Sequence, residues 1–386
     1  MPDRPPPHES EQFHRALELL TRENRHRWHH AVPIINGMRL AGKDPLPGAL
    51  QSEDESVRLR AMLALESMAT EADRDLLLSA LDDPFYDVRV GAIYALQNLE
   101  ARDTADRLIA MLDDPHPRPR AAAAWTLGWW AVPEAVEPLF DYAKRATGES
   151  RKPIRDALAG IVATDVNRVA AGLRSRSVRV RRIAAEALAW AAEGMINVCP
   201  SVEETLDLSE DEKCELARPA VPALIEALAD TDDEVRRSAS EALAWLEDAR
   251  AVEALLAHAD DPDLAFRASV IRALASSGDP RAMECVLAAH DDDAPEVRVA
   301  ATDLTPEDTD DPRVLDALID ALDDEDADVR VDAIWGLHGN AGPRVVEALK
   351  LALYDEDSGV RSTAVSALEE SLGVDAVPLL IPLLDD

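Results

Sequence analysis

The side chains of this sequence that could do chemistry are mainly cationic and aromatic. Residues 144–182, which we call the basic island, carry eleven Lys or Arg and three acids in a chain of net charge −36. Such a density of positive charge is favourable opposite an anionic surface. The island cations that we expect to contact a partner are Lys144, Arg145, Arg168, Arg174, Arg176, Arg179 and Arg182. An acidic protein is the preferred partner because the phosphate contacts of a nucleic acid weaken strongly in salt; pairing with the chain's own acids is the alternative.

Aromatic residues make a second candidate contact surface, consisting of Tyr94, Trp125, Trp129 and Trp130. At 100° per residue, Tyr94 and Trp125 point away from the apolar stripe of the helices in which we expect them. Exposed aromatic groups usually mark partner sites, so we expect these two and Trp130 on an exposed face. Trp129 lies on the flank of the stripe, as do Trp190 and Trp245, and packing between neighbouring units is the alternative there.

Catalytic motifs are missing from the sequence. It contains no phosphate-binding loop, no Gly-x-Ser-x-Gly elbow, no dinucleotide fingerprint and no His-Glu-x-x-His. Five of the nine histidines precede residue 46, and His26, His29 and His30 could share one helix face. Without a nearby Cys they make a weak metal site. We therefore predict no metal, no cofactor and no enzymatic activity.

An internal repeat positions these residues. Asp-Asp, a short polar stretch and Val-Arg recur along the chain, followed by a small residue three positions after the Arg. We call these arginines the anchors: Arg58, Arg89, Arg120, Arg155, Arg181, Arg236, Arg267, Arg298, Arg330 and Arg361. Most consecutive anchors are 31 or 32 residues apart. A period near 31 predicts a solenoid and not a set of globular domains.

Each unit of the repeat is expected to contain two helices. In one unit, Val88, Ala92, Ala95 and Leu96 fall on one helical stripe, and Asp87 places a favourable charge near the helix start. Small residues three positions after the anchors let paired helices approach closely. Neither helix can bury its stripe alone, so stability must come from stacked neighbours. The predicted fold is all-α, an α-solenoid of about ten two-helix repeats that forms a curved superhelix.

These units resemble HEAT repeats of the phycobilisome-lyase-like class. The resemblance is carried by the segment 220–228 followed by Val235-Arg236, Ala239 and Ala242-Leu243. It covers roughly residues 46–386. It implies an α-solenoid, and most proteins with such repeats are interaction scaffolds. A few are lyases or hydroxylases. Of the repeated His-Glu pairs of deoxyhypusine hydroxylase only His8-Glu9 is present, outside the repeats, and no catalytic residue of the bilin lyases transfers.

The first 45 residues precede the first clear unit. Phe13, Leu17 and Leu20 predict an amphipathic helix that begins near Ser10. Solenoids need an atypical end that covers their first apolar face. We therefore predict a helical cap over residues 1–45, partly disordered at its start.

The later irregularities of the repeat define the other boundaries. HEAT-like repeats are predicted at 46–193, an acidic helical insert at 194–218 and acidic HEAT-like repeats at 219–386. The insert contains capping-box patterns that begin at Ser201 and Ser209, and we expect it to contact the basic island. Its two cysteines, Cys199 and Cys214, are too few for a strong metal or disulfide signal. Pro306 interrupts one first helix and predicts a joint near residues 304–312.

Charge is distributed unevenly along the chain. Residues 1–193 carry 26 basic and 29 acidic side chains, whereas residues 194–386 carry 14 and 47. Acid excess with only five Lys is typical of a high-salt cytoplasm, where carboxylates keep the surface hydrated, and we expect a halophilic archaeon as the source. The longest apolar run, 121–132, is too short to span a membrane. Three cysteines fit a reducing cytoplasm.

These observations predict a cytoplasmic, non-enzymatic adaptor or scaffold that binds protein partners. A signalling adaptor is one version, by analogy with archaeal taxis adaptors that carry such repeats. Nucleic-acid binding through residues 144–182 is the first alternative. A lyase or hydroxylase of the HEAT-repeat class is the second.

Overall fold

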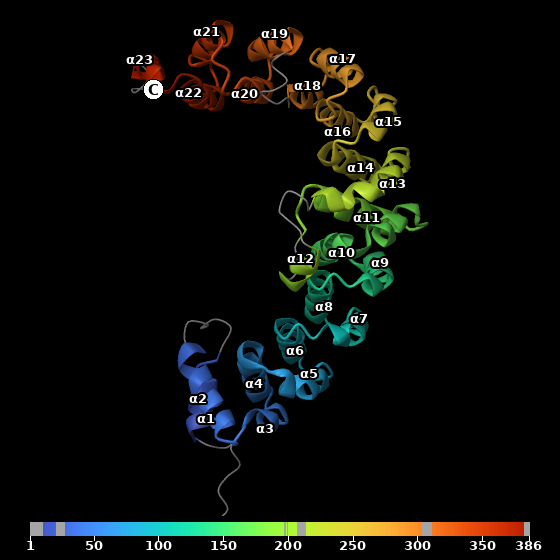
Figure 1. The fold of residues 1–386 in the computed structure, drawn as a ribbon, viewed down its shortest axis with the longest axis vertical. Helices are drawn as coiled ribbons and strands as arrows, with labels where there is room; N and C mark the ends of the chain where they lie inside the picture. Colours follow the sequence, from blue (N-terminus) through green and yellow to red (C-terminus); the bar gives the residue numbers. More distant parts are fainter. Residues whose placement is uncertain are drawn as a thin grey trace, which may run out of the picture. The chain divides into compact units, whose positions relative to one another are not determined.

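Every regular element that the structure describes is helical. The computed structural model describes residues 11–20, 28–196, 198, 200–206, 214–302 and 311–381. They divide into two compact units, one within residues 1–187 and 195–213, the other within 188–194 and 214–386. Each unit is a stack of helix pairs (Figure 1), which confirms the predicted all-α solenoid.

Every anchor arginine lies in the first helix of a pair. In the first unit the first helices are α4 (Glu55–Met68), α6 (Tyr86–Asn98), α8 (Pro117–Trp129), α10 (Arg151–Ala171) and α11 (Val178–Ala192), whose last residues belong to the second unit. The helices of the other layer are α3 (Leu46–Leu50), α5 (Arg74–Ala80), α7 (Ala105–Met111) and α9 (Val136–Arg145). Neighbouring first helices pack against each other from α4 to α10.

The second unit repeats this arrangement. Its first helices are α14 (Asp233–Leu246), α16 (Leu264–Ala275), α18 (Pro295–Thr302), α20 (Ala327–Gly336) and α22 (Ser358–Leu372). The other layer contains α13 (Val221–Ala227), α15 (Val252–Leu256), α17 (Pro280–Ala289), α19 (Pro312–Asp320), α21 (Pro343–Ala352) and α23 (Val377–Leu380). Among the described residues, no helix is long and apolar enough to cross a membrane. The joint predicted near residues 304–312 falls mostly on residues outside the described ranges.

Small residues set the spacing of the first helices. Ala61, Ala92 and Ala123, each three positions after an anchor, are completely buried, as predicted. Gly128 allows the closest approach, since a Cβ atom at this position would lie 2.4 Å from the Cα atom of Ala157. Helices α8 and α10 therefore pack almost backbone to backbone.

The N-terminal segment covers the first repeat. Helix α1 (Glu11–Glu18) is amphipathic and buries Phe13, Leu17 and the following Leu20, which confirms the helix predicted from these residues. Helix α2 (Trp28–Leu40) follows, and both helices pack against α4. Together they shield the outer face of α4 from water.

Helix α10 explains the shortest distance between anchors. The 26 residues between Arg155 and Arg181 leave little room for a second helix and a turn. Asp165 has φ −152° and ψ 75°, so α10 is two helices joined at a kink, and its last residues replace the second helix of the repeat. The kink lies inside the basic island.

Candidate partner-binding site

A ladder of ion pairs links consecutive repeats. Arg89 binds Asp114 through two hydrogen bonds of 2.7 Å, although the residues are 25 positions apart. The Asp114 carbonyl oxygen then accepts a hydrogen bond of 2.7 Å from the next anchor, Arg120. One aspartate per turn thus ties the repeat before the turn to the repeat after it. Side-chain pairs of this ladder are Arg58–Asp83, Arg89–Asp114, Arg267–Asp292, Arg298–Asp324 and Arg330–Asp355.

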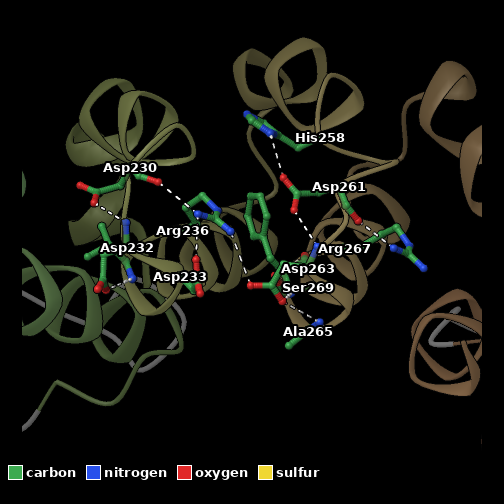
Figure 2. A network of polar contacts seen from close by, with 12 residues as sticks. Asp230, Asp232, Asp233, Arg236, His258, Asp261, Asp263, Ala265, Arg267 and Ser269 are labelled. Atoms are coloured by element: carbon green, nitrogen blue, oxygen red, sulfur yellow. Dashed lines mark hydrogen bonds and ion pairs between the residues drawn. The ribbon is translucent and has the colours of Figure 1, made fainter.

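The ladder also runs through the first repeats of the second unit, with one irregular step. The carbonyl oxygens of Asp230 and Asp261 accept hydrogen bonds from Arg236 and Arg267, at 3.3 and 2.7 Å (Figure 2). The guanidinium of Arg236 reaches Asp263, two residues beyond the usual position, at 3.5 Å. From the sequence alone, capping and hydration explain the acids of the later turns, at 291–293, 323–326 and 355–357. Asp263 does cap α16, but the pairing with anchors was missed.

Hydrogen bonds from the anchors control the ionisation of the ladder aspartates. Burial alone would raise the pKa of Asp292, Asp324 and Asp355, because it disfavours the charged carboxylate. Arginine and backbone N–H donors outweigh this effect, so the pKa of each carboxyl lies below its ordinary value. These pairs are therefore charged at neutral pH.

The ladder stops where the basic island begins. Position 145, which is 25 residues after Arg120 and would hold the next aspartate, is occupied by Arg145. Arg145 pairs with Asp113, while the Arg120 guanidinium lies 5.5 Å from the centre of the Tyr142 ring. The next anchor, Arg155, pairs with Asp156 of its own helix at 2.7 Å. At position 145 the island thus has a cation in place of a ladder acid.

An aromatic groove lies across α6, α8 and α10. It has a volume of about 410 Å³, and its apolar wall includes Val90, Tyr94, Ala121, Trp125 and Pro153. Arg118, Lys152 and Asp156 also line it. Asp156 is paired with Arg155, and Arg118 is paired with Asp87 at 2.6 Å. The Lys152 side chain is exposed, so it adds positive charge to the groove. We call this the aromatic groove.

A second cavity lies on the other side of the first turn of α10. It has a volume of about 240 Å³ and is bounded by the end of α9, the loop 146–148 and the start of α11. Arg151, Arg179 and Arg182 line it, and no acid does. Arg151 forms an ion pair with Glu186, and Arg179 donates a 2.6 Å hydrogen bond to the Lys144 carbonyl oxygen. We call this the basic pocket.

The repeats of this chain match the family model of HEAT repeats at residues 74–159, 221–304 and 315–386. The chain belongs to the HEAT-repeat family. These matched ranges contain the aromatic groove and most of the ladder. No curated protein sequence matches the chain.

Solved structures support the same fold for the HEAT-repeat chain. A mutant of the karyopherin Kap121p is 14% identical, with a TM-score of 0.60; the match covers 100% of this chain and 48% of that one. Kap95p, solved with RanGDP, is 14% identical with a TM-score of 0.58, covering 98% and 59%. Kap121p bound to Ste12p is 13% identical with a TM-score of 0.58, covering 97% and 47%. The chain spans about half the length of these karyopherins, and the likeness concerns the fold.

The structure brings together only part of the predicted aromatic surface. Tyr94 and Trp125 line the groove, and Trp129 stacks on Trp125 with ring centres 6.3 Å apart. The expectation for Trp130 was wrong, because its side chain is 2% exposed. Trp130 has helical backbone angles and lies ten positions after Arg120, on the same stripe of α8 as the completely buried Ala123 and Leu127, so the helical period itself directs its side chain into the core.

The predicted island cations are divided among several places. Arg179 and Arg182 line the basic pocket, whereas Lys144 and Arg174 line a separate cavity of about 200 Å³ between α9 and the end of α10. Arg145 pairs with Asp113, and Arg168 pairs with Asp165 at 3.0 Å. Arg176 is exposed. Pairing with the chain's own acids, the alternative given for the island, thus accounts for some of its charge.

Other predicted features lie apart from the two cavities. Trp245 is 56% exposed, so the packing expected between units does not occur at this tryptophan. The structure has a helix at the first capping box of the insert, α12 (Pro200–Leu206), and the hydroxyl of Ser201 accepts a 2.6 Å hydrogen bond from Arg102 and donates one to Glu100. These are contacts with the turn between α6 and α7. Ser209, Cys199 and the Cys214 side chain lie outside the described parts.

The candidate histidine site lies only partly within the described residues. The rings of His29 and His30 have centres 3.9 Å apart and are tilted by 44°, and His26 falls outside the described residues. Within the described ranges, no group of three His, Cys, Asp or Glu side chains could hold a metal ion.

Proposed function

We propose that this chain is a non-enzymatic, cytoplasmic scaffold that binds a protein partner through the aromatic groove. The observation that carries the proposal is the half-buried pair Tyr94 and Trp125, which lines one groove across three consecutive repeats. Aromatic side chains in such hollows contribute much of the affinity of protein interfaces. Kap121p and Kap95p, which share the fold, were solved with the proteins Ste12p and RanGDP. We also propose that the repeats belong to the phycobilisome-lyase-like class, that the scaffold acts as a signalling adaptor, and that its source is halophilic.

Mutation of one groove residue tests this function. The tagged chain is used to isolate its complexes from the source cells, and each recovered partner is purified and titrated against the chain by calorimetry. Trp125→Ala should weaken binding at least about tenfold, because it removes a central aromatic contact. The matched control is Trp335→Ala, at the equivalent position of a repeat in the second unit, where the side chain is 51% exposed.

One outcome would contradict the proposal that the aromatic groove binds the partner. If every recovered partner binds Trp125→Ala with unchanged affinity, the groove is not the contact site. A salt titration with duplex and single-stranded DNA and with RNA tests the nucleic-acid alternative, since phosphate contacts give a steep dependence of affinity on salt. The division of the island arginines among two cavities and several ion pairs does not favour that alternative.

A further inference from the structure

One turn of helix separates the aromatic groove from the basic pocket. Lys152 and Pro153, in the first turn of α10, line the aromatic groove. Arg151 and Ile154, in the same turn, line the basic pocket. Residues three apart share one side of a helix, so α10 directs its two sides into two different cavities. A molecule bound across this turn would reach both.

The two cavities differ in chemistry. The aromatic groove offers Tyr94, Trp125 and Pro153 to an apolar side chain. The basic pocket offers three arginines, and arginine binds carboxylates with paired, charge-assisted hydrogen bonds. The chain itself uses such pairs in the ladder, where Arg330 holds Asp355 through two hydrogen bonds of 2.9 Å.

The charge of the basic pocket suits one carboxylate. Glu186 already pairs with Arg151, and Arg182 also interacts within the chain. The pocket therefore retains less than the full charge of three arginines. A single negative charge matches this remainder better than a phosphate group, which carries nearly two charges at neutral pH.

We propose that an extended segment of the partner protein occupies both cavities, with an apolar side chain in the aromatic groove and an Asp or Glu in the basic pocket. The segment must cross the first turn of α10, and a helix with its side chains is about 10–12 Å wide. An extended chain advances about 3.3–3.6 Å per residue, so the two side chains are about three residues apart. This inference rests on the proposed function and specifies the partner as an acidic linear segment.

Selection from a peptide library tests the spacing and the charge. Random ten-residue peptides displayed on phage are panned against the purified full chain, and the enriched peptides are synthesised and titrated by fluorescence anisotropy. We expect them to share an apolar residue and an Asp or Glu about three positions away. Trp125→Ala and Arg179→Ala should each weaken binding about tenfold.

Matched variants separate the two cavities from general effects of charge and folding. Arg176→Ala removes an exposed arginine of the same island that lines neither cavity, and Trp335→Ala removes an exposed tryptophan of the second unit. Both should leave binding unchanged. Arg182→Ala is a second pocket variant, because Arg179 also holds the Lys144 carbonyl oxygen and its loss could disturb the loop. Circular dichroism confirms that each variant is folded.

Several results would overturn the inference. One is enrichment of peptides without an acid, or binding that needs Trp125 but not Arg179 or Arg182. In that case the partner would bind in the aromatic groove alone, and the proposal that it occupies both cavities would be wrong. A second is binding of a phosphoserine peptide with no binding of its Glu counterpart. A third is failure to enrich any peptide while the full partner still binds through Trp125.

Discussion

At the scale of single residues, each ladder aspartate combines several hydrogen bonds. Asp324 accepts two hydrogen bonds from Arg298, caps its own turn through the Asp326 N–H, and offers its carbonyl oxygen to Arg330. The Arg298 side chain is only 9% exposed, so its buried positive charge is compensated by this carboxylate. Asp324→Asn should lower the free energy of unfolding by about 2 kcal/mol, measured by urea denaturation.

A neighbour provides the control for this ladder variant. Asp323 is exposed, and Asp323→Asn removes the same charge as Asp324→Asn. This control should alter the free energy of unfolding by less than about 0.5 kcal/mol. The pKa of Asp324 lies below 3.8 in the folded chain. The pair therefore stabilises fully above the ordinary Asp pKa and loses its effect as pH falls through the folded pKa, so wild type and Asp324→Asn should converge as the pH falls below about 4. A difference that persists at low pH would mean that the ion pair is not its cause.

Residue-level prediction succeeded where one helix decides the outcome. Ala92 is buried because the helical period alone places it against the next repeat. Trp130 was misjudged because it was grouped with Tyr94 and Trp125, whereas the period of α8 places it on the buried stripe with Leu127. The ladder could have been found from the recurrent spacing of 25 between Arg and Asp. The basic pocket could not, because it depends on the shape of the loop 146–148.

At the scale of elements, the contact between α8 and α10 determines the width of the repeat stack. A methyl group at Gly128 would meet the Ala157 backbone, which cannot move aside as a flexible side chain can. Gly128→Ala should therefore lower the free energy of unfolding by about 1–3 kcal/mol, as overpacked contacts do. A methyl group at Gly37 in α2 would have no atom within 4 Å, so Gly37→Ala should be neutral or stabilise by up to about 1 kcal/mol. Equal effects of the two substitutions in urea denaturation would refute the steric explanation.

Element-level prediction was limited by irregular repeats. Helix α1 followed from its apolar spacing, and α12 lies at the capping box that begins at Ser201. The kink at Asp165 could not be predicted from the sequence, since it interrupts α10 without a Pro or Gly at that position. Contact of α12 with Glu100 and Arg102 joins residues about a hundred positions apart, and neither local propensity nor the repeat period specifies such a pairing.

At the scale of the whole molecule, two kinds of charge act against each other. The ladder pairs are largely buried and attractive, as in Arg330–Asp355, whose side chains are 8% and 14% exposed. Exposed acids at the same turns, such as Asp291 and Asp293, repel one another in a chain of net charge −36. Salt screens exposed charges within a few ångströms and affects buried pairs much less. Added salt should therefore remove repulsion while leaving most of the ladder intact.

This difference predicts that the chain is more stable in concentrated salt. The midpoint of thermal unfolding, followed by circular dichroism, should rise by about 5 °C between 0.1 and 2 M KCl, because reduced repulsion adds about 2 kcal/mol at this size. Replacing the exposed acids Asp291, Asp293 and Asp323 by their amides should raise the midpoint at low salt and reduce the response to KCl. If the amide variant responds as strongly as the wild type, a general effect of salt on burial explains the rise. If the midpoint falls in KCl, the ladder pairs outweigh the surface repulsion and the acid excess is not an adaptation to salt.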